Sequence, residues 1–143
     1  MTVKSVLTRK GTSVTTIEPT ANVAAAVKLL GEQRIGALVV TGAGRRVIGI
    51  LSERDIVRAL AQHGAQALER QVAEMMTRKV VTCTERDTLI ELMERMTAGK
   101  FRHMPVVEED SLVGIISIGD VVKSRVEEME RDTEVLQDYI RTA

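Results

Sequence analysis

Hydrophobic and polar positions follow the same order twice along this chain. Each time, a short β-branched segment predicts a strand, at Ser13–Ile17 and again at Lys79–Cys83. Apolar residues at helical spacing then predict a helix, from about Ala21–Gln33 and from about Asp87–Gly99. This repeated order indicates an internal duplication.

Two further strands and a second helix complete each copy. A polar turn joins the strands, at Gly42–Arg45 in the first copy and at Glu108–Asp110 in the second, and the helix begins at Ser52 or Ser117. A β-α-β-β-α unit of about 50 residues buries too little apolar surface to be stable by itself. We therefore expect an α/β (α+β) fold in which two such units pack sheet against sheet.

The end of each unit carries the clearest repeat. Ile48–Val57 aligns with Val113–Val122 as apolar-Gly-Ile-apolar-Ser-x-x-Asp-apolar-Val. The predicted organisation is an N-terminal extension (1–12), a first repeat domain (13–63), a linker with a short helix (64–78), a second repeat domain (79–126) and a helical extension (127–143).

The segments outside the repeats are connectors. A polar stretch at 63–71 leads to a short helix at Val72–Thr77. Arg125–Arg141 is a charged, amphipathic continuation of the last helix. Two interpretations of it stay open: the helix packs on its own unit, or it contacts a second copy or a partner protein.

Composition excludes several classes of function. The 143 residues carry 20 basic and 20 acidic side chains, so there is no basic surplus to neutralise the phosphates of a nucleic acid. Phe101 and Tyr139 are the only aromatic residues, which argues against stacking on single strands. No segment approaches the ~20 apolar residues that cross a bilayer, so we expect a cytoplasmic protein without a membrane partner.

The single cysteine and the two histidines offer little chemistry of their own. Cys83 lies in an apolar run and is expected to be a small, buried strand residue. One cysteine excludes a disulfide framework, and two histidines far apart in sequence give a zinc ion few ligands. We expect no metal site.

The repeated motif gives this chain a family resemblance. Gly49-Ile50-Leu51-Ser52-x-x-Asp55, Gly114-Ile115-Ile116-Ser117-x-x-Asp120 and the run Phe101–Val107 closely resemble the tandem CBS-domain pair, or Bateman module. The resemblance covers Ser13–Val126. It implies two intertwined units with two clefts related by pseudo-twofold symmetry, here called the first and second site. It also implies adenosine-type ligands: AMP, ADP, ATP, S-adenosylmethionine or NAD(H).

The Ser-x-x-Asp motif itself has two interpretations. A serine with an acidic residue three positions later is a capping box, which starts many helices. A helix N-terminus at the end of a sheet also favours an anion. In the resembling family the Asp accepts hydrogen bonds from both ribose hydroxyls and the Ser approaches the phosphate, and these roles fall on Asp55, Asp120, Ser52 and Ser117.

The resemblance assigns further residues to each site. Those expected at the first are Thr16, Ile17, Gly36, Ala37, Leu38, Ser52, Arg54 and Asp55. Those expected at the second are Thr82, Cys83, Thr84, Lys100, Arg102, His103, Met104, Pro105, Ser117 and Asp120.

The two sites are not expected to be equivalent. Arg102 and His103 of the second site, near Lys100, align with Gly36 and Ala37, which carry no charge. We therefore expect the second site to bind phosphate more tightly and the first to be roomier. The expected ligand is AMP first and NAD(H) second.

Nothing in the sequence has a local catalytic signature, so we expect no enzyme and no catalytic cofactor. Gly42-Ala43-Gly44 is not a dinucleotide fingerprint, there is no Walker loop, and neither Ser52 nor Ser117 has an adjacent base. The leading interpretation is an energy or redox sensor that signals to an unknown partner protein. The alternatives are a structural or nucleotide-buffering dimer and, against the charge balance, a transcription-linked protein. The resemblance also implies a homodimer.

Overall fold

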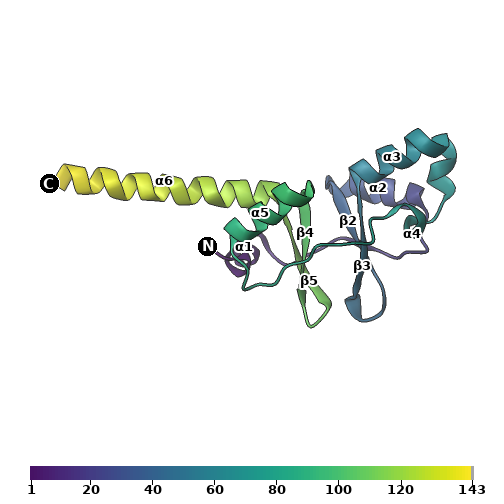
Figure 1. Ribbon diagram of the computed structural model, residues 1–143, viewed down its shortest axis with the longest axis horizontal. Helices are drawn as coiled ribbons and strands as arrows, with labels where there is room; N and C mark the ends of the chain where they lie inside the picture. The colour runs from purple at the N-terminus through teal and green to yellow at the C-terminus, as the bar shows by residue number, and fades with distance from the viewer. Residues whose placement is uncertain (143) are drawn as a thin grey trace.

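The computed structural model describes residues 1–142 and contains two β-α-β-β-α units side by side, with one long helix projecting from them (Figure 1). The elements of the first unit are β1 (Thr16–Ile17), α2 (Val23–Gln33), β2 (Ala37–Thr41), β3 (Val47–Ser52) and α3 (Glu53–His63). Those of the second unit are α5 (Leu89–Gly99), β4 (His103–Glu108), β5 (Ser111–Ser117) and α6 (Ile118–Thr142). The remaining elements are α1 (Val3–Lys10), α4 (Val72–Met75) and 3-10 turns at Ala43–Arg45 and Gly64–Glu69.

The two antiparallel hairpins confirm the duplication in detail. Ala37 pairs with Ser52 in the first hairpin, and His103 pairs with Ser117 in the second. Each hairpin shifts register after the aligned valine, Val40 in one and Val106 in the other. The helix that carries Ser-x-x-Asp therefore leaves the sheet at the same point in both units.

The expected strand Lys79–Cys83 is wrong in extent, because only Cys83 pairs with the second hairpin. Cys83 N–H donates to the carbonyl of Pro105 at 3.0 Å, and Val107 N–H donates to the carbonyl of Cys83 at 2.9 Å. In a parallel ladder the next donor would be the N–H of residue 105, aimed at the carbonyl of Val81. Proline has no N–H, so the ladder stops there. The first strand is also shorter than expected, at Thr16–Ile17.

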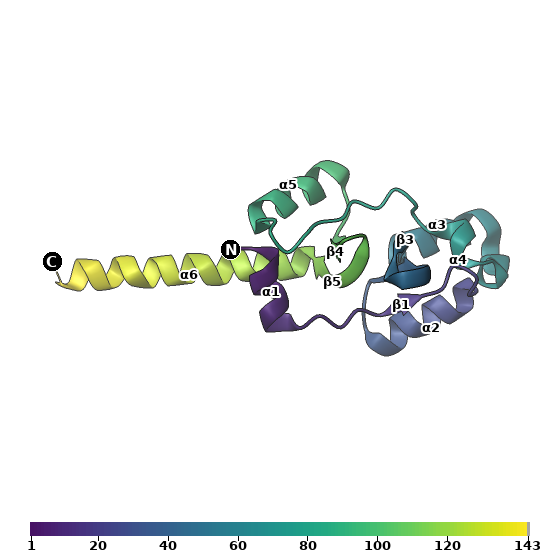
Figure 2. The ribbon, with the colours of Figure 1, turned by 90° about the horizontal axis from the view of Figure 1, so that it is seen from below.

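The N-terminal residues form a helix that the sequence had left as an extension. Helix α1 packs on the second unit, where Val3, Val6 and Leu7 belong to the same buried cluster as Leu92 and Met104. Helix α4 plays the equivalent part in the first unit. Each unit thus completes its core with a short helix that precedes the other unit in the chain, as Figure 2 shows from below.

Two glycines allow these helices to approach the sheets closely. A Cβ atom on Gly114 would lie 2.8 Å from Leu7 Cδ2, and one on Gly49 would collide with Met76 just after α4. The glycine of the repeated apolar-Gly-Ile motif therefore leaves room for a helix side chain on the strand. A larger residue at either position would force the Leu7 or Met76 side chain to shift.

Apolar positions on the helices that follow Ser52 and Ser117 divide between core and surface. Ile56 and Val121 are buried, whereas Val57, Val122 and Val126 are exposed. The amphipathic continuation of the last helix is confirmed, but beyond Glu128 it does not pack on its own unit. Helix α6 instead extends away from both units (Figures 1 and 2).

We expect Leu7→Ala to lower the free energy of unfolding by about 2–5 kcal/mol, because it opens a cavity in the core of the second unit. The melting temperature should fall by roughly 6–15 °C. Lys4→Ala, on the exposed side of the same helix, is the matched control and should move the transition by little. Equal effects of the two variants would mean that α1 is not part of the core.

Candidate functional site

Both Ser-x-x-Asp motifs form capping boxes. Ser52 N–H donates to Asp55 Oδ2 at 3.0 Å, and Asp55 N–H donates to Ser52 Oγ at 3.3 Å. The second unit repeats the pair, with Ser117 N–H 2.8 Å from Asp120 Oδ2 and Asp120 N–H 3.1 Å from Ser117 Oγ. The capping interpretation is therefore confirmed. A carboxylate has about four acceptor positions, so capping leaves each aspartate able to accept further hydrogen bonds.

The further partner of each aspartate differs between the units. Thr77 Oγ1 donates to Asp55 Oδ1 at 3.1 Å, whereas Lys10 Nζ donates to Asp120 Oδ2 at 2.7 Å and to the carbonyl of Ile115 at 2.9 Å. Lys10 ends α1, the helix that completes the core of the second unit, and Thr77 follows α4, the helix that completes the core of the first. Each residue therefore contacts the aspartate of the unit that its helix completes. The first site has a neutral partner for its carboxylate, and the second has a cation.

The cation changes the ionisation of Asp120. Burial by itself would raise the pKa of this carboxyl, but hydrogen bonds from Lys10 and from the Ser117 N–H outweigh it and lower the pKa below its ordinary value. Asp120 is therefore held as a carboxylate at neutral pH, with Lys10 as its counter-ion.

His103 lies where the two units meet. Its ring rests on Gly36 of the first unit, since a Cβ atom there would lie 3.3 Å from His103 Cε1. The room that a glycine leaves in the first site is thus taken by a histidine from the second unit. Burial lowers the pKa of His103, while Glu53 and Asp120 oppose this and Lys10 strengthens it, so the imidazole is neutral at pH 7.

Basic residues of both units line a pocket beside this junction. The pocket has a volume of about 290 Å³. Arg54 Nη1 donates to the carbonyl of Lys100 at 3.0 Å, which ties the start of α3 to the end of α5. Arg102 has its carbonyl fixed by the Ile118 N–H at 2.8 Å. The pocket is lined by Arg54, Met96, Thr97, Lys100, Phe101, Arg102 and Ile118.

Several expected site residues are enclosed instead. Leu38 and Met104 have no exposed surface, and Ala37, Ile17 and Pro105 are buried. Thr16 is half-buried and pairs with Val39 in the sheet. The side chains of Leu38 and Met104 fill the core, so at these two positions only backbone atoms are available at the surface of a site.

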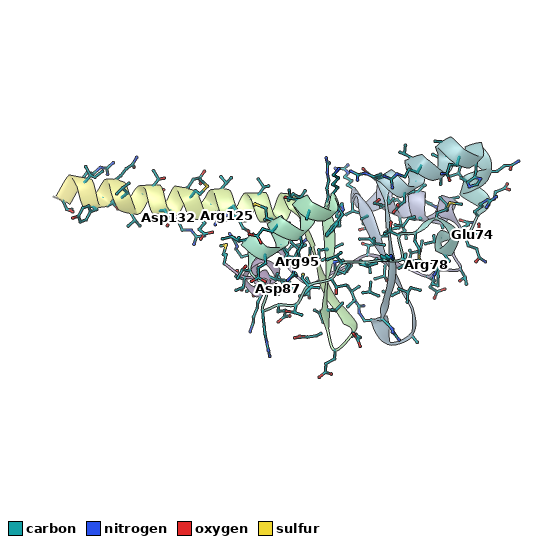
Figure 3. All side chains as sticks on the ribbon, in the orientation of Figure 1. Glu74, Arg78, Asp87, Arg95, Arg125 and Asp132 are labelled. Atoms are coloured by element: carbon teal, nitrogen blue, oxygen red, sulfur yellow. The ribbon has the colours of Figure 1, made fainter. Side chains whose placement is uncertain are left out.

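The segment before the second hairpin is fixed by Asp87. Thr84 N–H donates to Asp87 Oδ2 at 2.9 Å, and Arg95 Nη1 lies 3.2 Å from the same oxygen (Figure 3). Thr82 is half-buried and Thr84 is exposed. Cys83 is confirmed as a small buried residue, and burial raises the pKa of its thiol to about 12, so it stays protonated.

Lys10, Thr77 and Glu53 are the residues near the site that sequence reasoning missed. A signal for two of them was present: Thr8-Arg9-Lys10, which ends α1, recurs as Thr77-Arg78-Lys79, which follows α4. The repeat therefore extends further upstream than the strands. In this repeat Thr8 aligns with Thr77, and Lys10 aligns with Lys79. The two aspartates are therefore contacted from positions that are not equivalent, by Lys10 in one unit and by Thr77 in the other.

This arrangement defines a class of protein, the tandem pair of β-α-β-β-α units with paired helix-start carboxylates. The CBS domain family matches residues 3–62 and 72–127, and the chain belongs to that family. It is 34% identical over 120 residues to the CBS domain-containing protein CBSX3, mitochondrial, of Arabidopsis thaliana. That match covers 81% of this chain and 58% of the relative, so this chain spans little more than half of that protein.

Solved structures agree with this assignment. The CBS-domain containing protein ATU1752 from Agrobacterium tumefaciens is similar with a TM-score of 0.84 and 49% identity, over 87% of this chain and 99% of that one. The CBS domain pair of protein MJ0100, in complex with 5′-methylthioadenosine and S-adenosyl-L-methionine, has a TM-score of 0.80 and 25% identity over 90% and 98%. No helix within residues 1–142 is long and apolar enough to cross a membrane.

We expect Lys10→Met to lower stability at pH 7 by about 0.5–1 kcal/mol, because Asp120 loses its counter-ion. The pKa of Asp120 is depressed in the folded state, so its contribution is present above the unfolded pKa and disappears as pH falls through the folded one. The difference from the unmodified protein should therefore be complete at pH 7 and shrink as the pH falls below the ordinary aspartate value of 3.8. Thermal unfolding across this range measures it.

Arg141→Met is the matched control, because its ion pair with Asp138 leaves both side chains 75% exposed. Arg141→Met should leave the free energy of unfolding unchanged both at pH 7 and at low pH. A loss in Lys10→Met that persists undiminished at low pH would mean that Lys10 acts through Ile115 and not through Asp120.

Proposed function

We propose that this chain is a regulatory module that binds an adenosine nucleotide, AMP first and NAD(H) second, and signals its occupancy to a partner protein. The main support is the duplicated helix start, where Asp55 and Asp120 each keep free acceptor positions after capping. Two adjacent ribose hydroxyls are donors that suit one carboxylate. A solved relative adds weight, since the CBS domain pair of MJ0100 is in complex with 5′-methylthioadenosine and S-adenosyl-L-methionine.

Each site divides the ligand between sheet and helix. The ribose meets Asp55 or Asp120, and the phosphate meets Ser52 or Ser117 at the helix N-terminus, where the dipole favours an anion. The adenine lies toward Thr16 in one unit and Thr82 in the other. Because the neighbouring strand side chains are enclosed, the adenine is contacted by backbone atoms as well as by these threonines.

Lys10 favours a phosphate-bearing ligand at the second site. A ribose that takes both oxygens of Asp120 competes with the ammonium 2.7 Å away. A phosphate offers Lys10 a new partner, together with Arg102 and the neighbouring His103, whereas a neutral ligand leaves the cation unpaired. At the first site Thr77 gives way at little electrostatic cost. AMP therefore suits the second site, and ligands without phosphate suit the first.

Signalling follows from the position of the sites at the junction. His103 rests on Gly36, and Arg54 bonds to Lys100, so groups of both units take part in one set of contacts. A ligand that recruits Arg102 or His103 changes how the units are held together, and a partner that prefers one arrangement senses occupancy. The alternative function is a structural or nucleotide-buffering dimer without signalling.

The ligand assignment is tested by thermal shift and calorimetry with AMP, ADP, ATP, NAD, NADH and S-adenosylmethionine. At 100 times the dissociation constant a ligand adds about 2.7 kcal/mol, or roughly 5–10 °C. We expect the AMP shift to disappear in Asp120→Ala and to persist in Asp55→Ala. 2′-Deoxy-AMP should bind about tenfold more weakly, since one hydroxyl donor is lost.

The matched control is Glu91→Ala, because Glu91 accepts from Thr88 Oγ1 in a capping motif at the start of α5, outside the sites. It should lower the unliganded melting temperature as the aspartate variants do, yet leave the AMP shift intact. No shift with any nucleotide would return both motifs to helix caps and favour the structural dimer. Partner capture that is identical with and without AMP would favour buffering.

His103 makes a further prediction about pH. Burial lowers its pKa, and contact with a phosphate favours the protonated form, so AMP binding should take up a proton. We expect AMP affinity to rise about threefold to tenfold from pH 8 to pH 6.5. In His103→Gln this rise should vanish, and adenosine should show none with either protein. A pH dependence that survives in His103→Gln would assign the proton to another group.

A further inference from the structure

Every residue of helix α6 from Met129 to Thr142 is exposed, and only its Glu130–Glu134 stretch borders a pocket shared with Met1 and Arg9. Its buried residues are Val121 and Ser124, both near the start. Within residues 129–142, the side-chain hydrogen bonds and ion pairs run along the helix itself, as from Thr133 Oγ1 to the carbonyl of Met129 and from Arg141 to Asp138. A single helix of this length is marginal in water unless an apolar face is covered. A partner for this helix is therefore needed.

An apolar seam runs along α6 with the spacing of a coiled coil. Its members follow one another at alternating intervals of four and three residues, so that positions repeat every seven residues, as in a heptad. Val126 is 47% exposed and Ile140 is 64% exposed. Val121 and Ser124 lie on another side of the helix, so packing on the second unit leaves the seam open. The seam consists of Val122, Val126, Met129, Thr133, Leu136 and Ile140.

The residue types in the seam specify the partner's number and direction. Val126, Thr133 and Ile140 are β-branched and fall at the a positions of three consecutive heptads. The d positions are taken by Val122, Met129 and Leu136. β-Branched residues at a with leucine at d favour two parallel strands. The seam matches this pattern at its three a positions and at Leu136, whereas Val122 is β-branched and Met129 is unbranched. A second copy of this chain supplies such a strand with the same spacing.

Charges beside the seam favour the same orientation. In a parallel pair, Arg125 at g meets Glu130 at e of the other copy, and Asp132 meets neutral Gln137. An antiparallel pair centred on the seam instead brings each Glu130 and each Asp132 against its own counterpart. Figure 3 shows Arg125 and Asp132 along the projecting helix. In the single chain Arg125 bonds only to Glu128, 3.1 Å away on the same helix.

We propose that residues 122–140 form a parallel two-stranded coiled coil with a second copy of this chain. This interface is separate from the nucleotide sites and does not depend on the proposed function. It holds two CBS pairs at the same end of one rod. Four helix-start carboxylates then share one assembly, two from each chain.

The first test is the mass of the full chain in solution, by light scattering and sedimentation. We expect twice the chain mass of 15.7 kDa. Leu136→Asp should raise the dimer dissociation constant at least about tenfold, because it places a charge in the seam. Val135→Asp is the matched control. Val135 is the sequence neighbour of Leu136, is also apolar and is 69% exposed, but it lies outside the seam. It should leave dissociation unchanged.

The second test fixes the direction of the helices. Leu136→Cys should form an intermolecular disulfide on mild oxidation, because a parallel pair brings the two copies of position 136 together in one layer. Val135→Cys should not, and Cys83 is buried and does not interfere. A monomeric chain, or a dimer unaffected by Leu136→Asp, overturns the proposal. A dimer broken by Leu136→Asp that does not cross-link at 136 is antiparallel and also overturns it.

Discussion

In each unit, one helix side chain rests on a strand glycine, Leu7 on Gly114 and Met76 on Gly49. A unit of about 50 residues cannot bury enough apolar surface by itself. Each therefore takes a short helix that precedes the other unit in the chain, and the exchange makes the two halves one structure. The glycine favours this exchange, because a Cβ atom in its place would force the Leu7 or Met76 side chain above it to shift.

The exchange also determines the chemistry at the two helix starts. Lys10, the last residue of α1, donates to Asp120 of the second unit, and Thr77, which follows α4, donates to Asp55 of the first unit. Two copies of one motif thus acquire different partners, an ammonium in one and a hydroxyl in the other. Capping and binding are not competing explanations here. The same carboxylate that closes the helix start keeps acceptor positions, and in the function that we propose its neighbours bias which ligand it takes.

The projecting helix and the junction divide the molecule's tasks. His103 and Arg54 couple the units where we place the ligand, and the seam on α6 lies at a distance from them. Coupling between a ligand and a protein partner requires an arrangement that both can bias. The junction supplies one, because its contacts cross from unit to unit. The seam, in contrast, carries no charge and is apolar at every position except Thr133, which suits a permanent contact between copies.

Apolar periodicity and the repeated Ser-x-x-Asp determined the order of elements, the duplication, the hairpins and the helix starts, because these depend on residues close together in sequence. Long-range packing decided the rest. Only the fold shows that α1 belongs to the second core, that Lys10 reaches Asp120, and that His103 fills the space over Gly36. The proline that ends the strand at Cys83 acts from a position 22 residues later. Such contacts join residues that no local pattern relates, so tertiary structure alone determines them.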